Sequence, residues 1–298
     1  MQIKLTVGIC AKNCEKNVKH IVNSIASQDF PHEQIEVFFI EEDSNDGTLS
    51  SILTYAPKMK IEYEVYHLKR KGLGFSRNLV LKKARGKYIV WIDDGTIIPE
   101  NYLSKLFDVM EDHPNIGIAT GVLRILSGTS YISSWENMAA IIFSNNYAGK
   151  YTNKFPGAGG SIFRIDAMLQ VGGFDERITG AVEDTDIAYR ISTSGWKIYV
   201  EEILYSRDYS NSLSKVWAKG VWYGFGLHFL LHKYKELRIT LCKSTPMAGF
   251  LEGIISSFNA YKLTHRKAAF FLPIFFSFQR TALCWGFFKA HKSSYGHL

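Results

Sequence analysis

Two adjacent carboxylates, Asp93 and Asp94, directly follow a short apolar run, Tyr88–Ile92, that has the composition of a buried strand. Acidic residues at the carboxyl end of a buried strand lie where open α/β sheets bind their ligands. Carboxylate oxygens suit Mg²⁺ or Mn²⁺ held against a substrate phosphate. The alternative is that both acids and Gly95 only form the turn that closes the strand, because Asp and Gly favour turns.

Two further acidic clusters accompany this pair. Glu41–Asp43 follow a second apolar run, Ile35–Ile40, and Glu183–Asp186 precede a helical run, Ile187–Ser194. A carboxylate near neutral pH can serve as a general base. The cluster at the helix also has a structural explanation, because acids at a helix N-terminus are favoured by the helix dipole.

The elements that position these acids alternate along the chain. Strand-like runs are expected at Ile3–Cys10, Ile35–Ile40, Ile61–Tyr66, Tyr88–Ile92, Ile116–Leu123 and Ser161–Arg164. Helices are expected over about 15–28, 76–84, 101–112, 166–171 and 187–194, with a short one after 48. Residues 124–155 show no clear period. The alternation predicts βαβ units and an open, mostly parallel sheet flanked by helices.

Charge divides the 298-residue chain unevenly. Residues 205–298 hold 13 Lys and Arg against three acids, whereas the rest carries a small negative balance within the total of +7. A basic, aromatic C-terminal part suggests an anionic surface as its neighbour. The basic-aromatic mixture of 214–234 would also suit single-stranded nucleic acid, but no nucleic-acid module is recognisable, so no nucleic-acid partner is expected.

The C-terminal part contains two apolar stretches, Ala268–Phe278 and Thr281–Phe288, separated by Gln279 and Arg280 and flanked by basic residues. This pattern favours helices that lie in a membrane surface, with a buried packing tail as the alternative. No stretch reaches 18 uninterrupted apolar residues, so we expect no simple spanning helix. The N-terminal run Leu5–Cys10 is too short for a secretory signal, and we expect none.

As an ordered set, the motifs resemble glycosyltransferase family 2 over roughly residues 3–225. The matching segments are Thr6–Asn13, Gln28–Pro31, Glu41–Thr48, Gly72–Asn78, Asp93–Gly95, Gly157–Gly160, Gly172–Asp175 and Glu183–Asp184. Four positions depart from the family pattern. The base-reading Asp is Glu41, the third position of the D-x-D motif is Gly95, and the usual Pro and Tyr of the first loop are Cys10 and Lys12.

The resemblance implies a GT-A fold, which is a Rossmann-like α/β sheet with a helical C-terminal extension. It divides the chain into a GT-A glycosyltransferase domain over 1–225 and a basic aromatic extension over 226–298. Within the domain, the nucleotide-sugar half covers about 1–123 and the acceptor half about 124–225. The extension is the part expected to associate with a membrane.

The resemblance also assigns roles to residues. Asp184 is the catalytic base, beside Glu183; for a phosphate acceptor no base is required, and Asp184 would orient the donor sugar or the acceptor. A divalent cation, Mg²⁺ or Mn²⁺, would be held by Asp93 and Asp94. Lys69, Arg70 and Lys71 are alternatives to Arg77 as phosphate contacts. The nucleotide sugar would meet Ala11, Asn13, Glu41, Arg77 and Asp93, and the acceptor would meet Gly159, Gly160 and Trp222.

The function implied is an inverting transfer of a sugar from a nucleotide-diphosphate sugar to a lipid-linked or polysaccharide acceptor. We expect this at the cytoplasmic face of a membrane, with the protein peripheral or monotopic. The alternative from another class is a catalytically silent nucleotide-sugar or glycan-binding relative. A glycosidase would leave the nucleotide-site features without a role. A dinucleotide oxidoreductase lacks its glycine fingerprint after the first strand.

Overall fold

The computed structural model describes residues 2–69, 71–125, 130–155, 157–178, 180–207 and 212–293, without the side chains of 125 and 238–240. The strands are β1 (Leu5–Ala11), β2 (Ile35–Glu41), β3 (Glu62–His67), β4 (Tyr88–Trp91), β5 (Thr96–Ile97), β6 (Ile116–Ile125), β7 (Lys150–Thr152), β8 (Ser161–Arg164) and β9 (Lys197–Arg207). The helices are α1 (Glu15–Ala26), α2 (Thr48–Tyr55), α3 (Leu73–Lys83), α4 (Tyr102–Asp112), α5 (Tyr131–Tyr147), α6 (Ile165–Gln170), α7 (Glu183–Thr193), α8 (Leu213–Lys233), α9 (Ile239–Lys243), α10 (Pro246–Thr264) and α11 (Leu272–Lys292).

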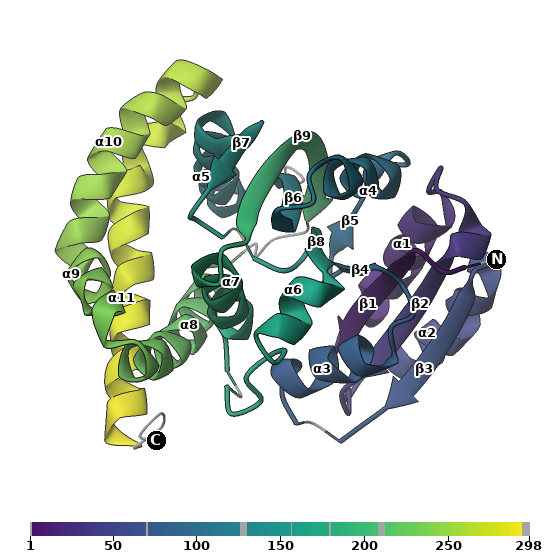
Figure 1. Cartoon of the computed structure of the whole chain (residues 1–298). Coiled ribbons are helices and arrows are strands. Elements are labelled where there is room, and N and C mark those ends of the chain that lie inside the picture. The colour runs from purple at the N-terminus through teal and green to yellow at the C-terminus, as the bar shows by residue number, and fades with distance from the viewer. Residues whose placement is uncertain are drawn as a thin grey trace. The chain divides into compact units, whose positions relative to one another are not determined.

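The chain forms two compact units. Unit 1 comprises 1–123, 147–179 and 184–207, and unit 2 comprises 124–146, 180–183 and 208–298. Figure 1 shows the sheet that forms unit 1 and the long helices of unit 2. The strand-end acids and the basic C-terminal part therefore belong mainly to different units.

Unit 1 contains one mixed sheet with the strand order β3-β2-β1-β4-β8-β6-β9-β5, and β7 pairs with β9. The first four strands are parallel, as the alternation of strands and helices predicts. From β4 onward the pairings β4–β8, β6–β8, β5–β9 and β7–β9 are antiparallel. The predicted α/β fold with helices on the sheet is therefore confirmed, and the antiparallel strands extend it.

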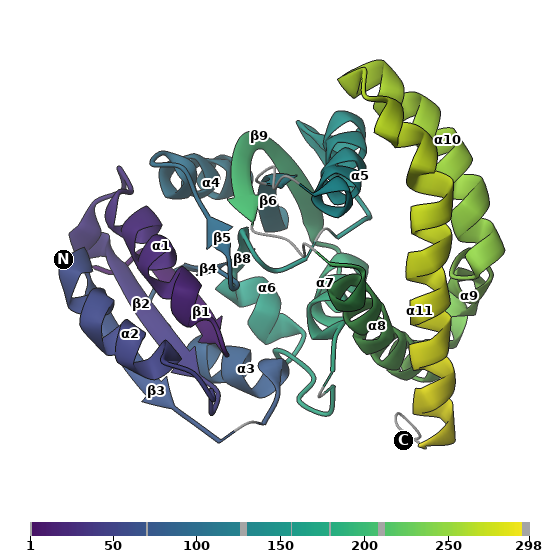
Figure 2. The ribbon, with the colours of Figure 1, turned by 180° about the vertical axis from the view of Figure 1, so that it is seen from behind.

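Successive residues of each central strand point to opposite faces of the sheet, and each face has its own core. Val37 and Val90 face the cluster that α1, α2 and α4 cover. Phe38 and Ile89, their neighbours in sequence, face the cluster that α3, α6 and α7 cover. Figure 2 shows α1 and α2 together over the parallel strands. Burial on both faces explains why these strands read as continuous apolar runs.

The six strands and the main helices of the sequence prediction are present within a few residues of their expected bounds. Three strands, β5, β7 and β9, and the helix α5 were not predicted. The helix expected over 187–194 begins earlier, at Glu183, so Glu183 and Asp184 lie in its first turn.

Unit 2 is helical. Its small core joins Met138 of α5, Val216 of α8 and Ala260 of α10 with Leu272 and Phe275 of α11. The indole of Trp135 donates a hydrogen bond of 2.9 Å to the backbone carbonyl of Ala268. In both views α10 and α11 run side by side, and close contacts of Gly249 with Phe276 and of Gly253 with Pro273 make them antiparallel.

One described segment, Lys267–Lys292, is long enough and apolar enough to cross a membrane by length and composition alone, which is weak support for a span. The sequence expectation of no simple spanning helix used uninterrupted apolar residues as its criterion. Pro273, Gln279 and Arg280 break that run, whereas a mean hydropathy averaged over the segment tolerates them, so the two criteria differ for this helix.

Candidate functional site

A glycine-rich loop, Gly157–Gly160, lies against two carboxylates that are 91 positions apart in the chain, Asp93 and Asp184. The backbone N–H of Ala158 donates a hydrogen bond of 3.1 Å to Oδ2 of Asp184. A Cβ added to Gly159 would lie 2.6 Å from Oδ2 of Asp93, so this residue packs directly on that carboxylate. The loop is held in place because the N–H of Gly160 donates to the carbonyl of Trp91, at 2.7 Å. Asp93 and Asp184 therefore border the same four-residue loop.

Asp93 lies between two arginines. Nη2 of Arg77 is 3.0 Å from Oδ1, and Nη2 of Arg207 is 3.1 Å from Oδ2. Burial of Asp93 acts to raise the pKa of its carboxyl, but the charges of Arg207 and Arg77 outweigh this effect and lower the pKa. Asp93 is therefore an ionised carboxylate at neutral pH, with its charge compensated by two guanidinium groups.

The two arginines differ in exposure. The side chain of Arg77 is 2% exposed and is enclosed by the rings of Trp91 and Phe174, each about 5.5 Å away. Arg207, at the end of β9, keeps 31% of its side chain exposed. Arg77 is thus placed to orient Asp93, whereas Arg207 presents a cation at the surface of the site.

The side chain of Asp94 contacts helix α1. This side chain is exposed, and its Oδ1 accepts a hydrogen bond of 2.9 Å from the amide of Asn17 on α1. Burial, followed by the nearby charge of Asp94, raises the pKa of the Cys14 thiol to about 12. Cys14 is therefore a protonated thiol at neutral pH and no metal ligand.

The acids fit a divalent cation only if other ligands complete the set. Within the described residues no third carboxylate, histidine or cysteine joins Asp93 and Asp94 in a metal-sized group. Mg²⁺ and Mn²⁺ prefer oxygen ligands and are commonly held by one or two carboxylates together with substrate phosphates and water. The carboxylate of Asp94 suits such a site, because it is exposed to solvent and a metal ion can reach it.

Glu41 lies at the end of β2, buried, beside the ends of β1 and β3. Its Oε1 accepts a hydrogen bond of 2.7 Å from the N–H of Ser44, and its Oε2 contacts Nδ1 of His67. Burial raises the pKa of this carboxyl, and the hydrogen bonds from Ser44 and His67 lower it further than burial raises it. Glu41 is therefore a fixed, ionised group at the edge of the sheet.

The loop after β1 is tied to the loop after β2. Asn13 has a left-handed backbone (φ 51°), its N–H donates to Oγ of Ser44 at 3.0 Å, and its Oδ1 accepts from the N–H of Asn45 at 2.8 Å. The ammonium of Lys12 donates to the carbonyl of Glu42. Ala11, the last residue of β1, is buried. Ala11, Asn13 and Glu41 thus lie in adjoining segments.

Asp186 and Asn78 have structural partners. Both Nε and Nη2 of Arg190 lie within 2.9 Å of Oδ2 of Asp186, four residues earlier on α7, and Nη1 donates to the carbonyl of Val171. Asn78 exchanges two hydrogen bonds with the backbone of Phe174. Within unit 1, these contacts hold α7 to Val171 and the turn at 172–175 to α3.

The remaining predicted site residues lie in several different segments of the chain. Glu183 is buried, and Trp222, on α8 in unit 2, is 39% exposed. Gly160 has a φ of 86°, and a Cβ there would clash with the ring of Tyr205. The ammonium of Lys71 lies 4.5 Å from the ring of Phe75, and Arg70 lies outside the described residues. No described contact tests the acceptor-side prediction.

Sequence reasoning missed several residues of this site. Arg207, His67 and Asn17 contact Asp93, Glu41 and Asp94, but none belongs to a motif that the sequence analysis used. The only signal was position. His67 directly follows the predicted strand Ile61–Tyr66 and pairs with Glu41, and Arg207 ends a strand that was not predicted.

Comparison with solved structures identifies the class of fold. A mannosyltransferase from Pyrobaculum calidifontis, solved with GDP-Man and Mn²⁺, aligns with a TM-score of 0.66 at 17% identity over 98% of this chain and 88% of that one. The S. aureus protein TarS, residues 1–349 with UDP-GlcNAc, aligns with a TM-score of 0.57 at 16% identity, over 98% and 91%. At these identities the likeness concerns the fold, which is that of the GT-A transferases, as predicted.

The family follows from the sequence comparison. The model described as "Glycosyl transferase family 2" matches residues 6–171, more than half of the chain, and this protein belongs to that family. The predicted resemblance is thereby confirmed.

Two curated relatives illustrate the similarity. The Poly(ribitol-phosphate) beta-N-acetylglucosaminyltransferase TarS of Staphylococcus aureus is 29% identical over 111 residues, which is 37% of this chain and 19% of TarS. The Poly-beta-1,6-N-acetyl-D-glucosamine synthase of Staphylococcus epidermidis is 22% identical over 90% of this chain and 69% of its own length. The chain therefore spans about a fifth of the TarS length.

Proposed function

We propose that this protein is an inverting glycosyltransferase that moves a sugar from a nucleotide-diphosphate sugar to a glycan or lipid-linked acceptor. The observation that carries the proposal is the loop at 157–160, which contacts Asp184 through Ala158 and Asp93 through Gly159. The proposed reaction has two requirements: the acceptor hydroxyl must lose a proton, and the diphosphate must leave. A base at Asp184 and a charge-compensated phosphate site at Asp93 border the same short loop and match these requirements.

In the proposed reaction the acceptor hydroxyl oxygen attacks the anomeric carbon from the face opposite the diphosphate. The new glycosidic bond forms as the bond from that carbon to the phosphate oxygen breaks, which inverts the configuration. The carboxylate of Asp184 takes the hydroxyl proton. Its orientation is fixed by the N–H groups of Ala158 and Thr185, which donate to Oδ2 and Oδ1 at 3.1 and 2.7 Å.

The leaving diphosphate gains negative charge as the sugar departs. The partly exposed guanidinium of Arg207 is the described cation beside Asp93 that is best placed to meet it. A divalent cation at Asp94, with Asp93 beside it, would supply further charge neutralisation when bound. The presence of Mn²⁺ with GDP-Man in the P. calidifontis structure supports this assignment by analogy.

The nucleotide would occupy the ends of β1 and β2, where Ala11, Asn13 and Glu41 adjoin. The UDP-GlcNAc complex of TarS supports a nucleotide-sugar donor by analogy. The names of the relatives, a poly(ribitol-phosphate) transferase and a polysaccharide synthase, support a surface-polymer acceptor. For that acceptor Gly159, Gly160 and Trp222 remain our assignment, within the proposed domain limits of 1–225 and 226–298.

We also propose that the protein acts at the cytoplasmic face of a membrane, bound through the basic extension. Large apolar side chains on α10 and α11 are exposed, among them Ile255, Phe258, Ile274 and Phe288. Apolar exposure together with an excess of Lys and Arg is typical of segments that lie on anionic lipid. Such a location would bring the protein to the surface that carries a lipid-linked acceptor.

The test combines donor binding with turnover. UDP-GlcNAc and GDP-mannose are titrated calorimetrically with and without Mn²⁺, and release of UDP or GDP is then followed with wild type and Asp184→Asn. We expect one donor to bind, and the variant to bind it equally while losing about 10²- to 10⁴-fold in turnover. Asp166→Asn is the matched control, because Asp166 is an exposed acid in the first turn of α6.

Two other outcomes would redirect the assignment. Donor binding without any turnover would favour the catalytically silent relative, for which the absence of a carboxylate at Gly95 is the motivating feature. Unchanged turnover in Asp184→Asn would remove the base assignment. No binding of either donor would contradict the transferase proposal itself.

A further inference from the structure

The helices α8 and α11 approach each other unusually closely. A Cβ on Gly224 would lie 2.1 Å from the carbonyl oxygen of Leu283, and one on Gly286 would lie 2.0 Å from that of Val221. Gly220 lies against Ala282, one turn earlier on both helices, so the two helices run parallel. Their C-terminal ends are therefore adjacent, and residues that continue this seam at four-residue spacing must meet.

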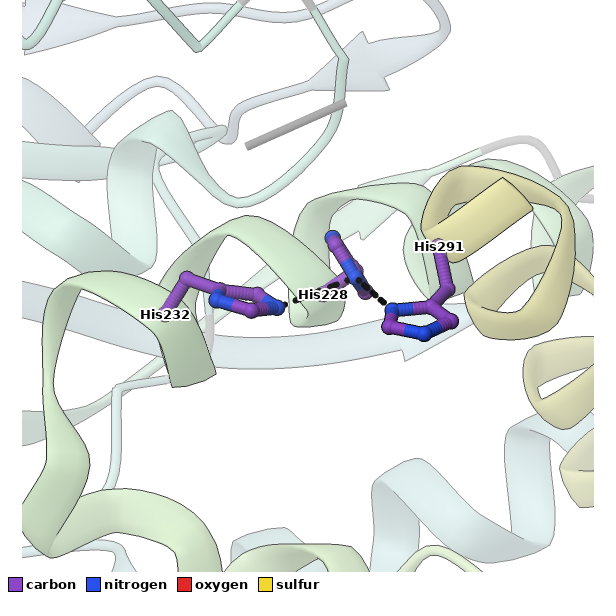
Figure 3. A group of neighbouring side chains, drawn as sticks. All are labelled: His228, His232 and His291. Atoms are coloured by element: carbon purple, nitrogen blue, oxygen red, sulfur yellow. Dashed lines mark hydrogen bonds between the residues drawn. The ribbon is translucent and has the colours of Figure 1, made fainter. Parts of the chain in front are cut away.

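Three histidines continue the seam. His228 and His232 follow Gly220 and Gly224 at steps of four on α8, and His291 follows Leu283 and Phe287 at steps of four on α11. Nε2 of His228 is 3.1 Å from Nε2 of His232 and 3.2 Å from Nδ1 of His291. Figure 3 shows the three rings in a row, with His228 between the other two. One candidate ligand atom from each residue lies within 4.8 Å of the others.

We propose that His228, His232 and His291 form a binding site for a divalent transition-metal ion, with Zn²⁺ as the best match, that links the last turns of α8 and α11. Zinc binds histidine nitrogens at 2.0–2.1 Å in tetrahedral geometry, which separates two such nitrogens by about 3.3 Å. The nitrogen–nitrogen distances of 3.1 and 3.2 Å are close to this separation. All three histidines belong to unit 2, whereas Asp93 and Asp94 belong to unit 1.

Hydrogen bonding alone satisfies this arrangement poorly. An imidazole nitrogen carries either one hydrogen or one lone pair, so Nε2 of His228 makes one good hydrogen bond with a neighbouring ring nitrogen, not two. In the cluster it has two such neighbours. A cation that accepts one lone pair from each ring removes this conflict at Nε2 of His228.

The surrounding charge distribution favours a cation in one respect and opposes it in another. His232 and His291 lie in the last turns of their helices, and the negative ends of two parallel helix dipoles face the cluster. Lys233, Lys289 and Lys292 belong to the same turns and oppose a cation. The ammonium groups of Lys233 and Lys289 lie over the rings of Tyr234 and Trp285, at 5.2 and 5.5 Å. The metal would keep at least one position for water, because His232 and His291 are exposed.

The experiment uses the full chain without a histidine tag, stripped with a chelator and free of nucleotide. Zn²⁺ is titrated calorimetrically, and Co²⁺ is added separately to read its visible absorption. We expect one Zn²⁺ per chain and a Co²⁺ spectrum of tetrahedral type. At a hundredfold excess over Kd the melting temperature should rise by about 5 °C. Affinity should fall as the pH is lowered, because metal binding requires deprotonated ligand nitrogens.

Variants identify the ligands. His232→Ala and His291→Ala are exposed positions and should keep the fold, while each weakens Zn²⁺ binding by more than about tenfold. His20→Ala, an exposed histidine on α1, is the matched control and should change nothing. Asp94→Asn should also leave Zn²⁺ binding intact, which separates this site from the proposed donor-site cation.

The proposal is overturned if Zn²⁺ does not bind below about 100 μM, far weaker than protein zinc sites bind. It is equally overturned if both histidine variants bind as the wild type does. A Zn²⁺ site that is lost in Asp94→Asn and retained in His291→Ala would contradict it as well. None of these results bears on the glycosyltransferase assignment, because no donor is present.

Discussion

The carboxylate of Asp93 is shared by two guanidinium groups that come from distant parts of the chain, Arg77 on α3 and Arg207 at the end of β9. The buried Arg77 fixes the carboxylate, and the half-exposed Arg207 can also reach a ligand. A charge-assisted hydrogen bond contributes about 1.5–3 kcal/mol, which corresponds to about 10- to 100-fold in affinity.

Replacing Arg207 by Gln should therefore weaken binding of the nucleotide-sugar donor by about tenfold or more. The melting temperature should change little, because the side chain is partly solvated. Isothermal titration with the donor that the wild type binds provides the measurement. Arg177→Gln is the control, because Arg177 is an exposed arginine of unit 1 paired with Asp175. Equal donor affinity in the two variants would exclude a phosphate contact at Arg207.

Glu136 on α5 is a second carboxylate with altered chemistry. It is buried, and among the residues that the structure describes its Oε2 has no hydrogen-bond partner. It lines a cavity of about 380 Å³ in unit 2 together with Lys219, Glu252 and Arg280. Burial, opposed only in part by the charge of Lys219, raises the pKa of Glu136 to about 7. The folded state therefore prefers the protonated carboxyl.

Since this pKa is higher in the folded than in the unfolded state, Glu136 costs stability as pH rises from about 4.5 to about 7. The loss amounts to at most about 3 kcal/mol at pH 8. Glu136→Gln should flatten this part of the stability profile, measured by urea unfolding between pH 5 and pH 8. Glu252→Gln, an exposed acid at the same cavity, should leave the slope unchanged. A wild-type profile without this slope would contradict the raised pKa.

At the level of residues, the sequence identified side chains better than their partners. Asp93, Asp184 and Glu41 were selected because acids follow strands or open a helix at motif spacing, and they do lie at strand ends and in the first turn of α7. Arg207 was missed because a fold with antiparallel strands brings it to Asp93. The spacing of His228 and His232 on one helix face was visible in the sequence, but the approach of His291 depends on helix packing.

Among the elements, β9 shows why the local pattern of apolar residues failed to predict a strand. Its buried residues alternate as Ile198 and Val200, then as Ile203 and Tyr205, so the period shifts by one residue at Glu201 and Glu202. A pattern that changes phase does not read as one strand.

The helix α5 was missed for another reason. Only three of its side chains are buried, and two of them, Ser133 and Glu136, are polar.

The loop 157–160 provides a test of how an element controls the site. A Cβ on Gly159 would lie 2.6 Å from Oδ2 and 2.9 Å from Cγ of Asp93, so Gly159→Ala must displace that carboxylate from its arginines. We expect a loss of about 1–3 kcal/mol in stability and more than about tenfold in donor turnover.

Gly172→Ala separates the effect on the site from backbone strain. Gly172 has a φ of 78° but open space around its Cβ position, so this variant is strained without touching Asp93. It should lose some stability and keep its turnover per folded molecule. Full turnover in Gly159→Ala, measured as nucleotide release, would show that the contact with Asp93 does not position it.

For the whole molecule, charge and exposed apolar surface coincide in the C-terminal part. Along α10 the residues Met247, Leu251, Ile255 and Phe258 follow one another at steps of four, four and three, and they are 69%, 55%, 68% and 62% exposed. Residues at this spacing lie on one helix face. The segment 205–298 has a balance of +10, which complements anionic lipid rather than another copy of the same basic surface.

This stripe leads to a prediction for the intact protein. Ile255→Glu combined with Phe258→Glu should reduce binding to vesicles of anionic and neutral lipid by more than about tenfold, because two large apolar side chains no longer enter the interface. Wild-type binding, measured by co-flotation, should weaken as salt rises, since part of the attraction is electrostatic. Leu53→Glu is the control, because Leu53 is 56% exposed on α2 in unit 1. If the double variant floats with the vesicles as the wild type does, the stripe does not bind lipid. If instead it converts a wild-type dimer in light scattering to a monomer, the face of α10 is covered by a second copy of the chain, and the membrane proposal loses its main support.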